Sequence, residues 1–223
     1  MPVATARGVN ARLYVALTMA ASPKTISAFT VSSTPASPNA LVTSAAHALT
    51  AGTIGVLSSP GTRYHGQAIR VMAPTANDFT AQGFDNSTHG AWEAGTITAA
   101  ATWGLLSESI GFEVSGGDAK NLDDTRLLDV VDRNVVVGMS AQTIALTTRG
   151  QNYSSDVANV IRNAALNSRE VLWKLELMQA NGPAVWFFNG TPSLSTFGLQ
   201  TGALGTGGFS VTLTGDVLNG SLT

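Results

Sequence analysis

Apolar and polar positions alternate in several short runs along this chain. The alternation is clear at 109–115, 143–148 and 209–214, and the apolar run at 11–17 predicts a first strand. A period of two places successive side chains on opposite faces of a strand, so these runs favour half-buried strands. Gly, Pro, Asn and Asp separate the runs, and β-branched residues recur within them. The pattern predicts a mainly β protein with many turns.

Between residues 41 and 98 the apolar runs become shorter and the turn residues denser. The stretch before them, 31–40, is rich in Pro, Ser and Asn and is expected to be a loop. Strands separated by turns at roughly every 8–12 positions are typical of small barrels. We therefore expect an inserted small β-barrel-like domain with a modest core of its own. Its strands are predicted at 41–45, 53–57, 67–73, 77–82 and 95–99.

One segment has helical periodicity. From Asp156 to Ser168 the apolar residues recur at spacings of three and four, which places them on one face of a helix. Ser155 is a good N-cap candidate, and Asp156 suits the positive end of the helix dipole. The runs at 171–178 and 184–188 flank a predicted turn at 181–183, so they predict a hairpin after the helix.

Charged residues are scarce in this sequence, and this excludes one class of function. Only 12% of residues are charged and the net charge is −2, about half the charged fraction usual for a soluble domain. A sequence-independent nucleic-acid binder needs a basic stripe, which this composition does not supply. So few charges also imply that other subunits cover much of the surface.

The absence of cysteine removes several chemistries at once. With no Cys, the chain has no disulfide, thiolate nucleophile, zinc knuckle or iron–sulfur cluster. No apolar run reaches the ~18 residues of a membrane-spanning helix, and the first residues do not resemble a secretory signal. We expect no stable membrane association.

Catalytic constellations are weak. His47, His65 and His89 are far apart in sequence and lie in the predicted insert, so turn or surface roles are expected rather than a metal site. No Gly-x-Ser-x-Gly elbow is present. The glycine-rich stretch 202–208 precedes a strand and not a helix, so it favours a hairpin loop over a phosphate cradle. We predict no enzyme activity, no catalytic residue, no metal and no cofactor.

Half of all the acidic residues fall between Glu108 and Arg133. A calcium loop is conceivable at 118–124, but the EF-hand spacing is missing. Either the stretch is a solvated loop, or a neighbouring subunit orders it through the apolar residues among the aspartates. The second hypothesis predicts an inter-subunit assembly loop made of Asp118, Leu122, Asp123, Asp124, Leu127, Leu128, Asp129, Val130, Val131 and Asp132.

Two patterns in the insert resemble a module found in tail components of tailed phages. They are V-T-x-A-A-H-x-L-x-x-G from Val42 to Gly52, with Ala48 where the module usually has Gly, and T-A-N-x-F-x-x-x-G-x-D from Thr75 to Asp85. The module runs from Val42 to Trp92, about a quarter of the chain. Outside it, the helix at 156–168 and the Trp- and Phe-rich hairpin that follows are similar to the major tail tube proteins of long-tailed, siphovirus-type phages.

The resemblance implies a tail-tube-type β-sandwich or barrel with one flanking helix, formed by residues 1–26 and 99–223. The insert, 27–98, would project outward from it. The resemblance further implies hexameric rings that stack into a tube, with the loop at 115–134 contacting an adjacent ring. Its partners would be copies of itself, a tape-measure protein and transiting DNA in the lumen, and terminator and tip proteins at the ends. The protein would be assembled in the host cytoplasm and reside in the virion tail.

Two other functions remain open from the sequence. The chain could be a tail terminator, baseplate or fibre protein that uses the β module to bind a host surface or a partner. A glycan hydrolase would need two carboxylates about 5–10 Å apart, and the acids of 108–133 are the only supply. Because a weakly acidic wall repels phosphate, the composition favours the tail tube, where DNA must pass without binding.

Overall fold

The computed structural model shows a mainly β protein with one helix in its described part, which confirms the fold class at that level. The structure describes residues 11–30, 39–60, 63–87, 89–107, 110–115, 119–123, 134–139, 142–149, 155–177, 184–196 and 206–221. The helix is α1 (Ser155–Leu166). The strands are β1 (Ala11–Met19), β2 (Lys24–Ile26), β3 (Ala28–Thr30), β4 (Asn39–Thr43), β5 (Ile54–Ser58), β6 (Ala68–Met72), β7 (Asp78–Gln82), β8 (Gly95–Ser107), β9 (Ile110–Ser115), β10 (Ala119–Asp123), β11 (Asn134–Met139), β12 (Thr143–Arg149), β13 (Val171–Leu177), β14 (Ala184–Thr196), β15 (Thr206–Leu213) and β16 (Leu218–Ser221).

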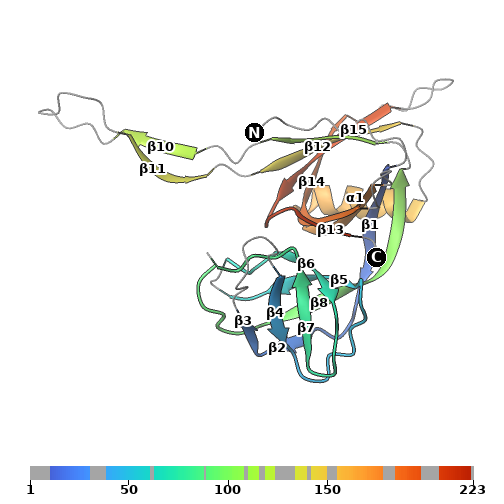
Figure 1. The fold of residues 1–223 in the computed structure, drawn as a ribbon. Coiled ribbons are helices and arrows are strands. Elements are labelled where there is room, and N and C mark those ends of the chain that lie inside the picture. The colour runs from blue at the N-terminus through green and yellow to red at the C-terminus, as the bar shows by residue number, and fades with distance from the viewer. Residues whose placement is uncertain are drawn as a thin grey trace, which may run out of the picture.

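Most of the strands pair in one antiparallel order. The order is β3-β4-β7-β6-β5-β8-β1-β13-β14-β15-β12-β9, with β16 beside β14 and β2 beside β8. We call β2 to β7 with the first part of β8 the small lobe, and the other strands of this order with α1 the body. β10 and β11 form a separate two-stranded ribbon, which Figure 1 shows extending away from both. We call this ribbon the arm.

The pairing within the small lobe runs in a circuit. β2 pairs with β8 and β3 pairs with β4, and only Ser27 separates these two short strands. β4 then leads through β7, β6 and β5 back to β8. The sequence pattern predicted five of these strands but missed β2 and β3. Three-residue strands are too short to show a period of two.

β8 belongs to both the small lobe and the body. Its residues from Gly95 to Ala99 pair with β2 and β5, and those from Ala100 to Ser107 pair with β1. The strand predicted at 95–99 is therefore much longer in the structure. Its continuation begins with Ala100 and Ala101, which are weak strand formers, so pairing with β1 decides the conformation there and local preference does not.

Helix α1 covers one face of the body. Val157, Ile161 and Ala164 are buried at the expected spacing, and the first two pack in a core with Leu13 and Trp173. The helix lies against β14, β1 and β8, on the body in Figure 1. The predicted helix at 156–168 is confirmed to within one or two residues at each end. The remaining members of this core are Ala11, Val15, Leu106, Ile144, Leu146, Leu175, Leu177, Phe188, Val211 and Leu213.

The small lobe packs against the opposite face of the body. Its core residues form one hydrophobic cluster with Ala16, Leu172, Val185, Phe187 and Leu218, which come from β1, β13, β14 and β16. The segment predicted as an outward insert, 27–98, thus shares its apolar core with the body. The lobe supplies Ile26, Ala40, Val42, Ile54, Leu57, Tyr64, Ala68, Ile69, Val71, Phe79, Ala81, Phe84 and Ile97 to the cluster.

Candidate functional site

The arm continues a hairpin that begins in the body. β9 pairs with β12 up to the Ser115–Thr143 pair, and β10 then pairs with β11 from Ala119–Met139 out to Asp123–Asn134. From Ala119 to Asp123 the described strand β10 spans about 13 Å. Figure 1 shows the two strands clear of the small lobe and of the body.

The predicted assembly residues map to the arm only in part. Leu122 and Asp123 lie on β10, at register positions opposite Val135 and Asn134. The structure corrects one detail, because residues 119–123 of the predicted loop form a strand. Ala-Lys-Asn-Leu-Asp has little strand preference of its own, whereas β11 carries three consecutive valines, so cross-strand pairing supplies the structure. Asp118, Asp124, Leu127, Leu128, Asp129, Val130, Val131 and Asp132 lie outside the described residues.

Two strands end the sheet order in the described part of the chain. β9 pairs on one side with β12, and β3 pairs on one side with β4. An edge strand presents backbone N–H and C=O groups that can pair with a further strand. The arm begins directly after β9, so one edge of the sheet and the arm lie next to each other in the chain.

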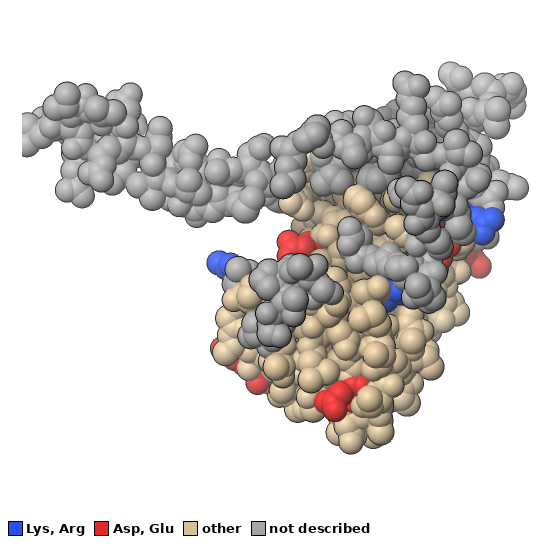
Figure 2. All heavy atoms as spheres, viewed as in Figure 1, with Lys and Arg blue, Asp and Glu red and all other residues tan. Residues whose placement is uncertain are grey.

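Charge is thinly spread over the molecule. On the face seen in Figure 2, the described surface of the small lobe is mostly uncharged, with isolated acidic and basic side chains. One cation of the lobe, Arg70, is nearly buried, and its guanidinium donates a hydrogen bond to Gln82 Oε1. Burial lowers the pKa of Arg70. The described surface on this face therefore shows no basic stripe for a polyanion.

A polar network fixes the small lobe to the body. Gln67 of the lobe donates through Nε2 to the Asp216 carbonyl at 3.3 Å and accepts the Asp216 N–H through Oε1 at 2.8 Å. In the body, both oxygens of Glu170 are engaged, by Asn189 Nδ2 at 2.6 Å and by Thr214 Oγ1 at 2.9 Å. None of these residues was predicted from the sequence. Gln67, a polar residue directly before the mostly apolar strand Ala68–Met72, was the signal that could have indicated a bonded, buried amide.

A pocket of about 490 Å³ opens along this junction. The lobe contributes Val56 and His65 to its wall, and the body contributes Leu17, Val160 and Arg169. Because Glu170 is already bonded through both oxygens, its carboxylate is held in place as part of the junction.

A second cluster of charges lies on the sheet. Lys174 Nζ is 2.8 Å from Glu176 Oε1 and lies 4.2 Å from the ring centre of Tyr14 and 5.2 Å from that of Trp103. Burial raises the pKa of Tyr14, and the nearby Glu176 carboxylate raises it further. A phenol in this setting stays protonated at neutral pH, so it serves as a hydrogen-bonding and packing group and not as a base.

The three histidines occupy separate places in the small lobe. His47 is buried, and its Nδ1 accepts the Leu49 N–H at 2.9 Å. His65 is exposed at the pocket wall, and His89 packs on Tyr64 and Phe84. Among the described residues, no three His, Asp or Glu side chains gather as a metal site would require.

The described part of the chain contains no helix with the length and apolar character needed to cross a membrane. Of the glycine-rich stretch 202–208, residues 206–208 begin β15, and the rest lies outside the described residues. Comparison with known proteins finds no matching protein family, no matching curated protein and no matching solved structure.

Proposed function

We propose that this chain is a structural subunit of a phage tail tube, polymerising through its arm as stacked, hexameric rings. The observation that carries the proposal is the arm itself, which leaves the sheet next to an edge strand and pairs only within itself among the described residues. The resemblance of Val42–Trp92 to a phage tail module supplies the biological setting.

The physical argument starts from the weakness of an isolated ribbon. A two-stranded hairpin is marginally stable in water at best, and three or more strands or a packing surface are needed for independent stability. The two strands of the arm can gain that surface from a neighbouring subunit. Since the site contacted on the neighbour differs from the arm, the contact is heterologous, and repetition of such contacts builds rings or filaments.

The sparse charge supports the same function. Subunits that bury their surfaces against copies of themselves need few charged side chains, because charged groups are depleted at the centres of interfaces. A conduit also benefits from a wall that does not hold DNA, and this chain has a net charge of −2. The proposed partners are other copies of the chain, a tape-measure protein and passing DNA, and terminator and tip proteins at the tube ends. The proposed location is the virion tail, reached by assembly in the host cytoplasm.

Removal of the arm tests the proposal. Residues 116–142 are replaced by Asn-Gly, which closes Ser115 and Thr143 with a two-residue hairpin turn. We expect the unmodified chain to form rings or tubes at high concentration in negative-stain micrographs. The shortened chain should remain folded by circular dichroism and sediment as a monomer. Because its body is untouched, loss of assembly would come from the arm.

A matched pair of point variants sharpens the test. Leu122 and Val135 are register partners in the ribbon, and changing both to Ser replaces two apolar residues of the arm by polar ones. Asn121→Ser alters the neighbouring position and serves as the control. We expect the double variant to assemble poorly and the control to assemble normally. Monomers only from the unmodified chain at high concentration, or tubes from the shortened chain, would refute the proposal and favour a terminator, baseplate or fibre protein.

A further inference from the structure

His89 of the small lobe has a buried nitrogen without a hydrogen bond. Among the described residues no group bonds to Nδ1 of this ring, although the atom is shielded from solvent. The ring lies 4.9 Å from Phe84 and 5.2 Å from Tyr64, measured between ring centres. Buried polar atoms are almost always hydrogen-bonded in folded proteins, so an exception calls for an explanation.

The aromatic neighbours of His89 connect several parts of the lobe. Tyr64 contacts Phe29 and Trp92 at centroid distances of 5.1 Å each, and its hydroxyl donates to the Gly90 carbonyl at 3.0 Å. Trp92 Nε1 donates to the Ile26 carbonyl at 3.2 Å. The ring of His89 therefore sits where the segment from Phe84 to Trp92 is attached to the rest of the lobe.

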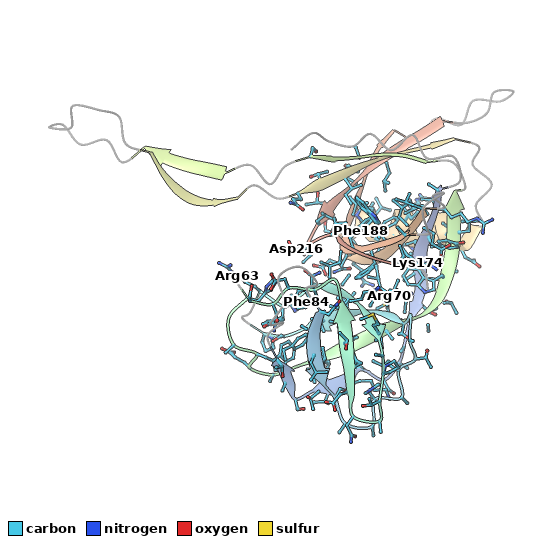
Figure 3. The ribbon with its side chains drawn as sticks, viewed as in Figure 1. Arg63, Arg70, Phe84, Lys174, Phe188 and Asp216 are labelled. Atoms are coloured by element: carbon cyan, nitrogen blue, oxygen red, sulfur yellow. The ribbon has the colours of Figure 1, made fainter. Side chains whose placement is uncertain are left out.

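Three charged residues face the ring from different elements. Asp85 precedes it in the same segment, Arg63 lies in the turn before β6, and Asp216 belongs to the body between β15 and β16. Figure 3 shows Asp216 on the body side of the junction, with Arg63 and Phe84 on the lobe. Burial lowers the pKa of His89, Asp216 and Asp85 oppose this effect, and Arg63 adds to it.

We propose that His89 is an acid-operated switch that attaches the Phe84–Trp92 segment when neutral and releases it when protonated. A neutral imidazole tolerates an unbonded Nδ1 lone pair among aromatic rings. Protonation by solvent converts that atom into an N–H donor with a positive charge, and a buried unpaired charge is strongly unfavourable. The imidazolium leaves Tyr64 and Phe84 and turns outward to the carboxylates of Asp85 and Asp216.

The direction of the pH dependence follows from the pKa. Because the pKa of His89 is lower in the folded chain than its ordinary value of about 6.5, the unfolded chain binds the proton more readily. The stability associated with the neutral ring is fully present above that ordinary value and is lost as the pH falls below it. Acid therefore loosens this segment and weakens the part of the lobe that faces Asp216.

His89→Phe is the central variant of the test, because it keeps an aromatic ring but removes the titration. His65→Gln is the matched control, since His65 is an exposed histidine of the same lobe. Melting temperatures of the full chain are measured from pH 7.5 to pH 5, and the histidine resonances are followed by NMR over the same range. These measurements do not depend on assembly, so their outcome is separate from that of the proposed function.

We expect the melting temperature of the unmodified chain and of the His65→Gln variant to fall by several degrees on acidification. The His89→Phe variant should show a distinctly smaller fall. The His89 resonance should titrate below its ordinary pKa and lose its contacts with Tyr64 on protonation. Parallel curves for the unmodified and His89→Phe chains would overturn the proposal. If the His89→Phe variant does not fold, the His89 resonance of the unmodified chain provides the test. A protonated His89 that keeps its contacts with Tyr64 would also overturn the proposal.

Discussion

Gly66 offers a quantitative test of how the small lobe meets the body. This residue has φ = 78°, and a Cβ added there would lie 2.4 Å from Thr214 Cγ2 and 3.6 Å from Glu170 Oε2. The backbone conformation alone costs an alanine about 1–2 kcal/mol. The collision adds to this, because Thr214 Oγ1 is bonded to Glu170 Oε1 at 2.9 Å. Displacing Thr214 would break that hydrogen bond. A buried hydrogen bond to a charged group contributes about 1.5–3 kcal/mol, and this one contributes less because the pair is exposed.

We therefore expect Gly66→Ala to destabilise the chain by about 2–4 kcal/mol in urea unfolding. Gly90→Ala is the matched control, because Gly90 has φ = 83° and no atom lies within 4 Å of its added Cβ. The control should lose only the conformational part, about 1–2 kcal/mol. Thr214→Ser removes the colliding methyl and keeps the hydroxyl. It should restore part of the stability in the Gly66→Ala background, and the coupling is measured by a double-mutant cycle.

Equal losses for Gly66→Ala and Gly90→Ala would refute this reasoning, since they would show that nothing at the junction resists the added carbon. The same conclusion would follow if Thr214→Ser gave no rescue. Both results would mean that the lobe and the body do not pack at Gly66 as the structure describes.

Two further predictions concern the helix core and the junction between lobe and body. Ile161→Ala should lower the free energy of unfolding by about 2–4 kcal/mol, because this side chain is 2% exposed beneath the helix. Leu166→Ala, at a side chain 69% exposed, should change that free energy by less than about 0.5 kcal/mol. Urea unfolding monitored by circular dichroism compares the two variants, and similar losses would contradict the assigned helix face. Gln67→Ala leaves the Asp216 N–H without its partner and should lower the free energy of unfolding by about 1–3 kcal/mol. Amide hydrogen exchange at Asp216 should become faster in this variant and stay unchanged in Gln82→Ala, which alters only the lobe's own strand β7. Equal exchange of Asp216 in both variants would argue against the hydrogen bond from Asp216 to Gln67.

The sequence predicts this fold best where one face of an element is buried. The helix at 156–168 and the strand at 143–148 were found because Val157, Ile161, Ile144 and Leu146 repeat with the period of their element. Strands that lack a clear pattern of their own and form only because a neighbouring strand pairs with them were not predicted. β10 has little strand preference of its own, and β16 is a four-residue strand beside β14.

The sequence draws attention to the region of the arm but does not indicate its form. The concentration of acids and apolar residues after Glu108 led to the hypothesis of an assembly segment, which stays a prediction. Residues 119–123 and 134–139 of the structure form a ribbon at this place in the chain. Nothing local indicated that this ribbon would continue the β9–β12 hairpin. The Gln67–Asp216 contact was hidden for a related reason, because 149 positions separate the two residues.

The passage of β8 through both the small lobe and the body has a consequence for how this chain tolerates change. Ile97 is buried in one core and Leu106 in the other, on the same strand. The register with β1 already shifts along the body half of this strand, at Ala101 and at Leu106. Away from such bulges side chains alternate, so one residue added between Ala99 and Ala100 would reverse the facing of one half relative to the other. Only an insertion of two residues, or a bulge that absorbs one, keeps Ile97 and Leu106 both inward. If the lobe is exchanged for another module, an even or odd number of residues added at this point of β8 would therefore decide whether both cores can form.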